Sequence, residues 1–199
     1  MRLMPIDAEP ILAEMVEYIF GVLDALGIRN GAIHSEVKME ERGPVLIEAN
    51  CRLHGGEGTW APMAEACLGY SAVSAMIDSY LDPLAFAALP RVPDNFMAHA
   101  KEAKIRTGVS GYVTEIDPAA LKAIRSLASY QSEMIGVKVG SKIEKTIDLL
   151  TSCGNVNLVN ASLDDLEADY KRFHEIVERG IFKVADKMPR SGNSIMPVQ

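Results

Sequence analysis

Apolar residues recur at helical spacing near the start of the chain. They are Ile11, Leu12, Met15, Val16, Ile19, Leu23 and Leu26. Steps of three and four residues place such a set on one face of an α-helix. Asp7 and Pro10 suit the start of this helix, and Gly27 suits its end. The pattern therefore predicts one amphipathic helix whose apolar face covers another element.

Two short segments of alternating apolar and polar residues follow, at 34–38 and 45–52, joined by 39–44. Side chains alternate between the two faces of a strand, so the pattern predicts a β-hairpin with two unlike faces. One face is apolar and suits a covering helix; it carries Ile33, Val37, Val45 and Ile47. The other is polar and carries His34, Glu36, Glu48, Asn50 and Arg52. Antiparallel partners have a constant index sum, so a turn centred on Arg42 places Glu36 opposite Glu48.

Two opposed carboxylates predict a metal site. Like charges directly opposite each other destabilise a sheet, and a hard divalent cation held by carboxylate and amide oxygens offsets that repulsion. Glu36, Glu48 and Asn50 suit Mg²⁺ (or Mn²⁺), with water and phosphate oxygens as the remaining ligands. Arg52 follows on the same predicted face, where its planar guanidinium would bind a phosphate or a carboxylate. The alternative is that both acids are solvated charges, with Arg52 as a salt-bridge partner.

The segment after Arg52 favours a binding site over a solvated surface. Here His54 precedes three glycines that fall within four residues, Gly55, Gly56 and Gly58. Glycine loses more conformational entropy on folding than any other residue. So many glycines in one loop indicate backbone that turns sharply or closely approaches a ligand.

Taken together, these residues resemble the metal- and phosphate-binding end of the ATP-grasp superfamily. The resemblance rests on Glu36, on the run from Glu48 through Asn50 to Arg52 that begins twelve residues later, and on His54-Gly55-Gly56. The preceding run at 26–36 strengthens it. The branch that the chain resembles contains L-amino acid ligases and carnosine-synthase-like carboxylate–amine ligases.

The resemblance implies a role for each matching position. Glu36, Glu48 and Asn50 would bind the magnesium ions that bridge to the ATP phosphates. Arg52 would be the catalytic residue, steadying the transferred phosphoryl group and the acyl-phosphate intermediate. Four residues would lie near the acceptor substrate, namely His34, His54, Gly55 and Gly56.

A complete ATP-grasp enzyme also has an N-terminal Rossmann-like domain and a subdomain that contacts adenine. The residues before Glu36 are taken up by one predicted helix, so neither part is expected among them. The resemblance therefore implies the C-terminal half of a ligase. It leaves open whether the missing half or a self-associated copy of the chain is a partner, and whether this chain alone is active.

Beyond the loop, further helices are predicted at 60–81, with a break near Gly69, and at 118–127 and 162–179. Strands are predicted at 96–105, 109–116, 130–139, 146–150 and 155–159. Prolines at 83, 90 and 93 mark a boundary. We expect the C-terminal part of an ATP-grasp domain at 1–90, a small α+β C-terminal domain at 91–185 and a flexible tail at 186–199. The fold class is α+β: an antiparallel sheet packed by helices, followed by a small α/β C-terminal domain.

Composition favours a cytoplasmic protein that acts on small molecules. The formal net charge of −7 argues against nucleic acid or an anionic membrane as the main partner. No apolar run has the length of a membrane span. The three cysteines show no metal or disulfide spacing and are expected to be reduced thiols.

Three functions are consistent with these features. The first is an ATP- and Mg²⁺-dependent ligase that joins a small-molecule carboxylate to an amine through an acyl phosphate. The second is a non-catalytic or regulatory ATP-grasp remnant that binds only metal or nucleotide. The third is a metal-dependent hydrolase, for which His34 or His54 would have to serve as the general base.

Overall fold

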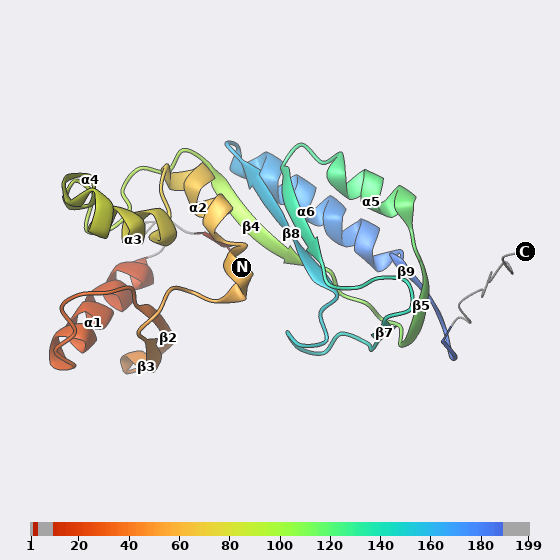
Figure 1. Cartoon of the computed structure of the whole chain (residues 1–199), viewed down its shortest axis with the longest axis horizontal. Coiled ribbons are helices and arrows are strands. Elements are labelled where there is room, and N and C mark those ends of the chain that lie inside the picture. The colour runs from red at the N-terminus through yellow and green to blue at the C-terminus, as the bar shows by residue number, and fades with distance from the viewer. Residues whose placement is uncertain (1, 4–9, 189–199) are drawn as a thin grey trace, which may run out of the picture. The chain divides into compact units, whose positions relative to one another are not determined.

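The computed structural model describes residues 2–3 and 10–188 of the chain (Figure 1). It divides into two compact units, residues 1–101 with 159–163 and residues 102–158 with 164–199. The predicted domain ranges, 1–90 and 91–185, stay predictions, and most of the predicted tail lies outside the described residues. Among the described helices, none is long and apolar enough to cross a membrane.

The first unit contains the predicted amphipathic helix, α1 (Pro10–Ala25). Gly27 ends it in the left-handed region, with φ of 69°. The Ile28 N–H then donates to the Leu23 carbonyl at 3.0 Å, a bond that closes the last turn of a helix. The predicted start signal at Asp7 lies outside the described residues.

The predicted hairpin is present as β2 (His34–Glu40) and β3 (Gly43–Asn50), which form a two-stranded antiparallel sheet. Near the turn, Glu40 pairs with Gly43 and Val37 with Leu46; beyond a bulge at Glu36/Val37, Glu36 pairs with Glu48. Helix α1 contacts both strands, and the Tyr18 hydroxyl accepts a hydrogen bond from the Leu46 N–H at 3.1 Å. The helix therefore covers the hairpin, as its apolar stripe predicts.

The apolar face of the hairpin differs from the prediction at two residues of β3. Val45 pairs with Lys38 and Leu46 pairs with Val37, so Leu46 rather than Val45 shares the face of Val37. Ile47 is the extra residue at the bulge and is 60% exposed. Strict alternation had placed it on the covered face with Val37 and Val45. A bulge sets two residues of one strand against one of the other, which breaks the alternation locally.

The helical stretch after the glycine loop is broken where the sequence predicts. Helix α2 (Ala61–Leu68) ends at Gly69, whose φ is 79°, and α3 (Ala72–Leu81) follows. Ser71 caps α3 by accepting the Ser74 N–H at 3.2 Å. A short helix that was not predicted, α4 (Pro83–Ala87), comes next. The core of this unit is small; it groups Met63, Cys67 and Ala100 with the half-buried Leu3, Trp60, Leu68, Ala98 and Val159.

Strand β1 (Arg2–Leu3) pairs antiparallel with the start of β4 (His99–Lys104), which continues into the second unit. There, β4 is followed by β8 (Gly154–Asn160) and β6 (Tyr130–Ile135) in strand order. A separate three-stranded sheet has the order β7-β5-β9. Its strands are β7 (Lys142–Ile143), β5 (Gly111–Ile116) and β9 (Phe182–Ala185).

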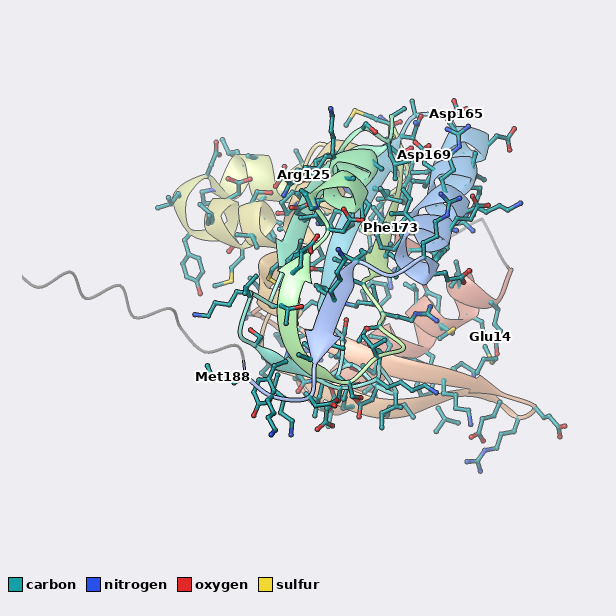
Figure 2. All side chains as sticks on the ribbon, turned by 90° about the vertical axis from the view of Figure 1, so that its right-hand side faces the viewer. Glu14, Arg125, Asp165, Asp169, Phe173 and Met188 are labelled. Atoms are coloured by element: carbon teal, nitrogen blue, oxygen red, sulfur yellow. The ribbon has the colours of Figure 1, made fainter. Side chains whose placement is uncertain are left out.

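Two helices complete the second unit, α5 (Pro118–Arg125) and α6 (Leu163–Glu178). Their apolar faces are buried: Ile124 of α5 and Leu166 and Phe173 of α6 have no exposed surface. Figure 2 shows Phe173 and Asp169 on α6. The buried carboxylate of Asp169 accepts the Ser129 N–H at 2.8 Å, which ties the end of α5 to α6.

The prediction of a strand at 146–150 is wrong. This segment is a turn in which the Thr151 N–H donates to Asp148 Oδ1 at 2.9 Å, and the Ile147 N–H donates to Thr151 Oγ1 at 2.9 Å. Asp and Thr side chains compete with a strand for backbone hydrogen bonds in this way. The short strands β7 and β9 were not predicted because neither has enough residues to show a period of two.

Candidate functional site

The paired carboxylates lie side by side on the hairpin. Glu36 is the direct partner of Glu48, and His34 is the direct partner of Asn50. One ring nitrogen of His34 and one carboxylate oxygen from each glutamate lie within 4.8 Å of one another. The two acids are exposed and His34 is half-buried. Two carboxylates and an imidazole at this spacing are a donor set that fits a divalent cation.

Asn50 contacts the same cluster. Its Nδ2 donates to Glu48 Oε1 at 2.7 Å, and more weakly to the His34 carbonyl at 3.4 Å. The first bond partly offsets the repulsion between the two acids. Because an amide coordinates cations through its oxygen, Asn50 can act as a ligand while its nitrogen holds Glu48 in place.

The sequence predicted that Arg52 lies on the strand, but the structure places it outside the strand. Strand β3 ends at Asn50, and the Arg52 N–H donates back to the Asn50 carbonyl at 2.8 Å in a bend. The exposed guanidinium donates to the Leu53 carbonyl at 3.0 Å. The alternation that assigned Arg52 to the acidic face therefore does not apply to it. Arg52 follows the cluster in sequence on a segment that has left the sheet.

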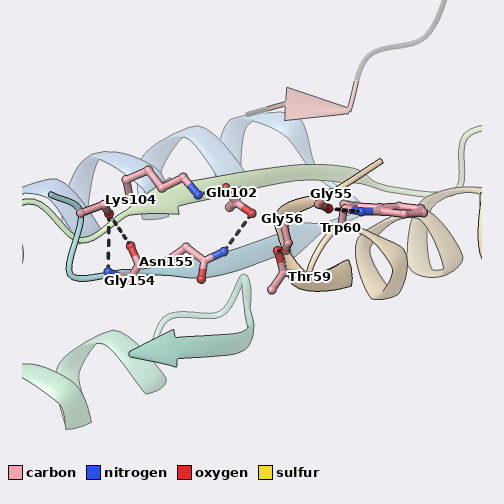
Figure 3. A network of polar contacts seen from close by, with 9 residues as sticks. Gly55, Gly56, Thr59, Trp60, Glu102, Lys104, Gly154 and Asn155 are labelled. Atoms are coloured by element: carbon pink, nitrogen blue, oxygen red, sulfur yellow. Dashed lines mark hydrogen bonds and ion pairs between the residues drawn. The ribbon is translucent and has the colours of Figure 1, made fainter. Parts of the chain in front are cut away.

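The predicted substrate loop is an ordered turn. Gly56 and Gly58 have φ of 69° and 74°, values that favour glycine, and they bound the short 3₁₀ helix η1 (Gly56–Gly58). The Trp60 indole N–H donates to the Gly55 carbonyl at 2.8 Å (Figure 3). It also donates to the His54 carbonyl at 3.1 Å. A single indole thus fixes the start of the loop.

The loop also reaches the acidic cluster. His54 Nδ1 and His34 Nε2 are 2.9 Å apart, a hydrogen bond between two imidazoles. The Nδ1 atom of His34 is buried without a hydrogen-bond partner among the described residues. His34 and His54 were predicted near the acceptor substrate, but neither their contact nor the role of Trp60 was foreseen. Pairing between a strand residue and a loop residue twenty positions away leaves no periodic signal in a sequence.

A mostly apolar cavity of about 200 Å³ lies beside this loop. Its walls are formed by Arg2, Leu3, His54, Trp60, Met63 and Ala64. The cavity is large enough for a small apolar group, and His54 links its wall to His34.

The fold places the chain among known proteins. The chain has the ATP-grasp fold, and the matches described next fit the C-terminal part of that fold. This confirms the family resemblance and the α+β architecture expected from the sequence.

Particular relatives sharpen this placement. The chain is 31% identical over 173 residues to dapdiamide A synthase from Enterobacter agglomerans, a match that covers 78% of this chain and 38% of that protein. Among solved structures, L-amino acid ligase from Bacillus licheniformis superposes with a TM-score of 0.69 at 20% identity, covering 90% of this chain and 42% of the ligase. Phosphoribosylglycinamide synthetase from Anaerococcus prevotii superposes with a TM-score of 0.61 at 17% identity, covering 94% and 44%.

The chain thus spans about two fifths of the length of these relatives. No family model matches the sequence.

Proposed function

We propose that the chain contributes the metal- and phosphate-binding end of an ATP- and Mg²⁺-dependent carboxylate–amine ligase. The observation that carries this proposal is the pairing of Glu36 with Glu48 beside Asn50, in a chain similar to a dapdiamide synthase and an L-amino acid ligase. The substrates are a small-molecule carboxylate, for which an amino acid is the first choice, and an amine.

The reaction has two steps. A substrate carboxylate oxygen attacks the γ-phosphorus of ATP, the bond to the β-phosphate oxygen breaks, and an acyl phosphate and ADP form. The amine nitrogen then attacks the acyl carbon, phosphate leaves, and the nitrogen loses a proton to give the amide. Catalysis of phosphoryl transfer depends mainly on positioning and charge neutralisation.

In this proposal each side chain has a defined task. Glu36, Glu48 and Asn50 hold the cation, which when bound neutralises charge on the phosphate oxygens. Arg52 follows them on a bend outside the sheet, where an exposed guanidinium can turn to bind a phosphate or carboxylate oxygen. The loop at His54–Gly56 and the cavity beside Trp60 contact the acceptor.

The test is a matched pair of substitutions in the hairpin, Glu48→Gln and Glu41→Gln. Both remove one negative charge, but Glu41 lies in the exposed turn, away from the cluster. ADP release is measured with MgATP and pairs of amino acids. We expect Glu48→Gln to lower the rate by about 10²–10³, the effect of losing one electrostatic contact in a catalytic site, and Glu41→Gln to leave it unchanged. Wild-type turnover by Glu48→Gln would overturn the assignment.

A second candidate is a module that binds metal or nucleotide without catalysis. The observation in its favour is that the acidic cluster lies on exposed side chains of a chain that spans about two fifths of the length of its relatives. Cation binding that depends on Glu48, without ADP release for any substrate pair, would favour this alternative. The cytoplasm, where ATP is available and thiols stay reduced, is the proposed location for either function.

A further inference from the structure

The cluster on the hairpin contains a nitrogen donor that was not part of the predicted metal site. The ring of His34 reaches the same point as the carboxylates of Glu36 and Glu48, within 4.8 Å. His34 precedes Glu36 by two residues in one strand, and both are paired with residues two apart in the other. All three side chains therefore project from one face of the sheet.

The hydrogen bonding of His34 indicates what its ring can do. One nitrogen, Nε2, is bonded to His54 Nδ1 at 2.9 Å, whereas Nδ1 is buried and has no partner among the described residues. If His34 Nδ1 carried the proton, a buried donor would be left unsatisfied, which is unfavourable. In the other neutral tautomer, Nε2 donates to His54 and Nδ1 presents a lone pair. A cation bound by Nδ1 together with the two carboxylates would satisfy that lone pair.

His54 is itself held in place. Its backbone carbonyl accepts the Trp60 indole N–H at 3.1 Å, and the centroids of the His54 and Trp60 rings are 5.8 Å apart. An imidazole that ligates a metal usually donates its other ring N–H to a neighbouring acceptor, which fixes the tautomer and the ring orientation. His54 provides this acceptor, so it is a positioning residue.

We propose that His34 is a nitrogen ligand of the cation, alongside Glu36 and Glu48, and that the site consequently prefers Mn²⁺ to Mg²⁺. This inference rests on the metal site of the proposed function and adds a ligand and a selectivity to it. Mg²⁺ favours oxygen ligands and keeps much of its water. Mn²⁺ accepts carboxylate oxygens, and first-row transition ions bind imidazole more readily than Mg²⁺ does.

The first experiment detects the nitrogen directly. Mn²⁺ is added to the full chain, and electron spin-echo envelope modulation is recorded with natural-abundance protein and with protein labelled with ¹⁵N at histidine. We expect a ¹⁴N coupling that changes to a ¹⁵N coupling on labelling and disappears in His34→Gln. The control is His99→Gln, a change of the same kind on β4, which should keep the coupling. The isotope exchange needs no mutation, so it detects a histidine ligand even if His34→Gln does not fold, and a coupling that persists in His54→Gln then excludes His54 as that ligand.

The second experiment measures selectivity. The affinities of wild type, His34→Gln and His54→Gln for Mn²⁺ and for Mg²⁺ alone are determined by titration calorimetry. His34→Gln should weaken Mn²⁺ binding by about tenfold or more. It should change Mg²⁺ binding less, because an imidazole is a weaker ligand for Mg²⁺ than for Mn²⁺. His54→Gln should weaken Mn²⁺ binding by about 10–100-fold, as removal of an outer-shell partner does, yet keep the nitrogen coupling.

The outcomes separate this proposal from the function on which it rests. Mn²⁺ that binds wild type but not Glu48→Gln, without any histidine nitrogen coupling, overturns the His34 ligand and leaves the oxygen site intact. A coupling that survives His34→Gln and vanishes in His54→Gln also overturns it. Wild-type protein that binds neither cation overturns both the ligand and the proposed metal site.

Discussion

The two units of the chain bury their apolar residues to different degrees. Among the residues that the structure describes, the large side chains that are fully buried belong to the second unit, with Cys67 the exception. In the first unit, the hairpin that carries the acidic cluster has no fully buried residue among its described positions. Large apolar side chains are exposed on α3 and α4 of this unit, namely Met76, Ile77, Tyr80, Leu81, Leu84 and Phe86.

This difference shows that the candidate site lies in the unit with fewer fully buried large side chains. A two-stranded hairpin is only marginally stable by itself, and here one helix supports it. Binding elements are commonly drawn from the parts of a protein with low local stability. A bound cation would therefore stabilise the hairpin far more than the second unit, and the following tests compare the two regions.

The largest effect is expected for a matched pair of leucines. Leu166→Ala removes a side chain with no exposure from the second unit, whereas Leu84→Ala removes one that is 84% exposed from α4. The first should lower the free energy of unfolding by about 3–5 kcal/mol through lost burial and a cavity, and the second by no more than about 0.5 kcal/mol. Urea unfolding followed by circular dichroism measures both. Equal losses would contradict the contrast between a closed and an open region.

A buried carboxylate tests the second unit further. Asp169 is 3% exposed and accepts the N–H of the fully buried Ser129 at 2.8 Å. Asp169→Ala leaves that N–H without its acceptor and should cost about 1–3 kcal/mol. Asp169→Asn retains an acceptor oxygen and should restore part of the loss, as judged by the urea midpoint. If alanine and asparagine are equivalent, the hydrogen bond does not contribute.

Removing a charge from the hairpin should stabilise it, whereas the substitutions in the second unit should destabilise the protein. In metal-free buffer, Glu36→Gln relieves the repulsion with the directly opposite Glu48 and should slow amide exchange in β2 and β3. The gain is about 0.2–1 kcal/mol, typical of cross-strand pairs. Glu41→Gln in the turn is the control and should leave exchange unchanged. Added Mn²⁺ should reverse the order, because only the wild-type hairpin keeps both carboxylate ligands.

The smallest effect concerns two buried thiols, Cys67 in the first unit and Cys153 in the second. Burial raises the pKa of both. Each thiol then stays protonated in the folded protein, so its contribution to stability is full below the ordinary pKa of about 8.5 and is lost as pH rises through the higher folded value. The exposed Cys51 should react first with a thiol reagent at neutral pH. Cys67 should follow before Cys153 if the first unit opens more easily.

Much of this architecture follows from local pattern. The stripe from Ile11 to Leu26 predicted α1, and Gly69 marked the break between α2 and α3. These features depend on residues close in sequence. The strand predicted at 146–150 failed because the Asp148 and Thr151 side chains bind the backbone there.

The site was predicted only in part, and the prediction assumed a regular hairpin without a bulge. The pairing of Glu36 with Glu48 is as expected, but the turn is shorter than the one assumed, and a bulge supplies the missing residue. Arg52 was assigned to a strand that ends two residues earlier. The contact between His34 and His54 depends on how the loop folds back, which no spacing encodes.

The bulge has a consequence for how such sites are recognised in other chains. Between the turn and the bulge, paired residue numbers add up to 83, and beyond it they add up to 84. Removing Ile47 would restore a regular ladder and still leave the two glutamates facing each other, now eleven positions apart instead of twelve. The interval between the acids can therefore vary by one while the geometry persists. A search that fixes this interval would overlook chains carrying the same pair of opposed acids.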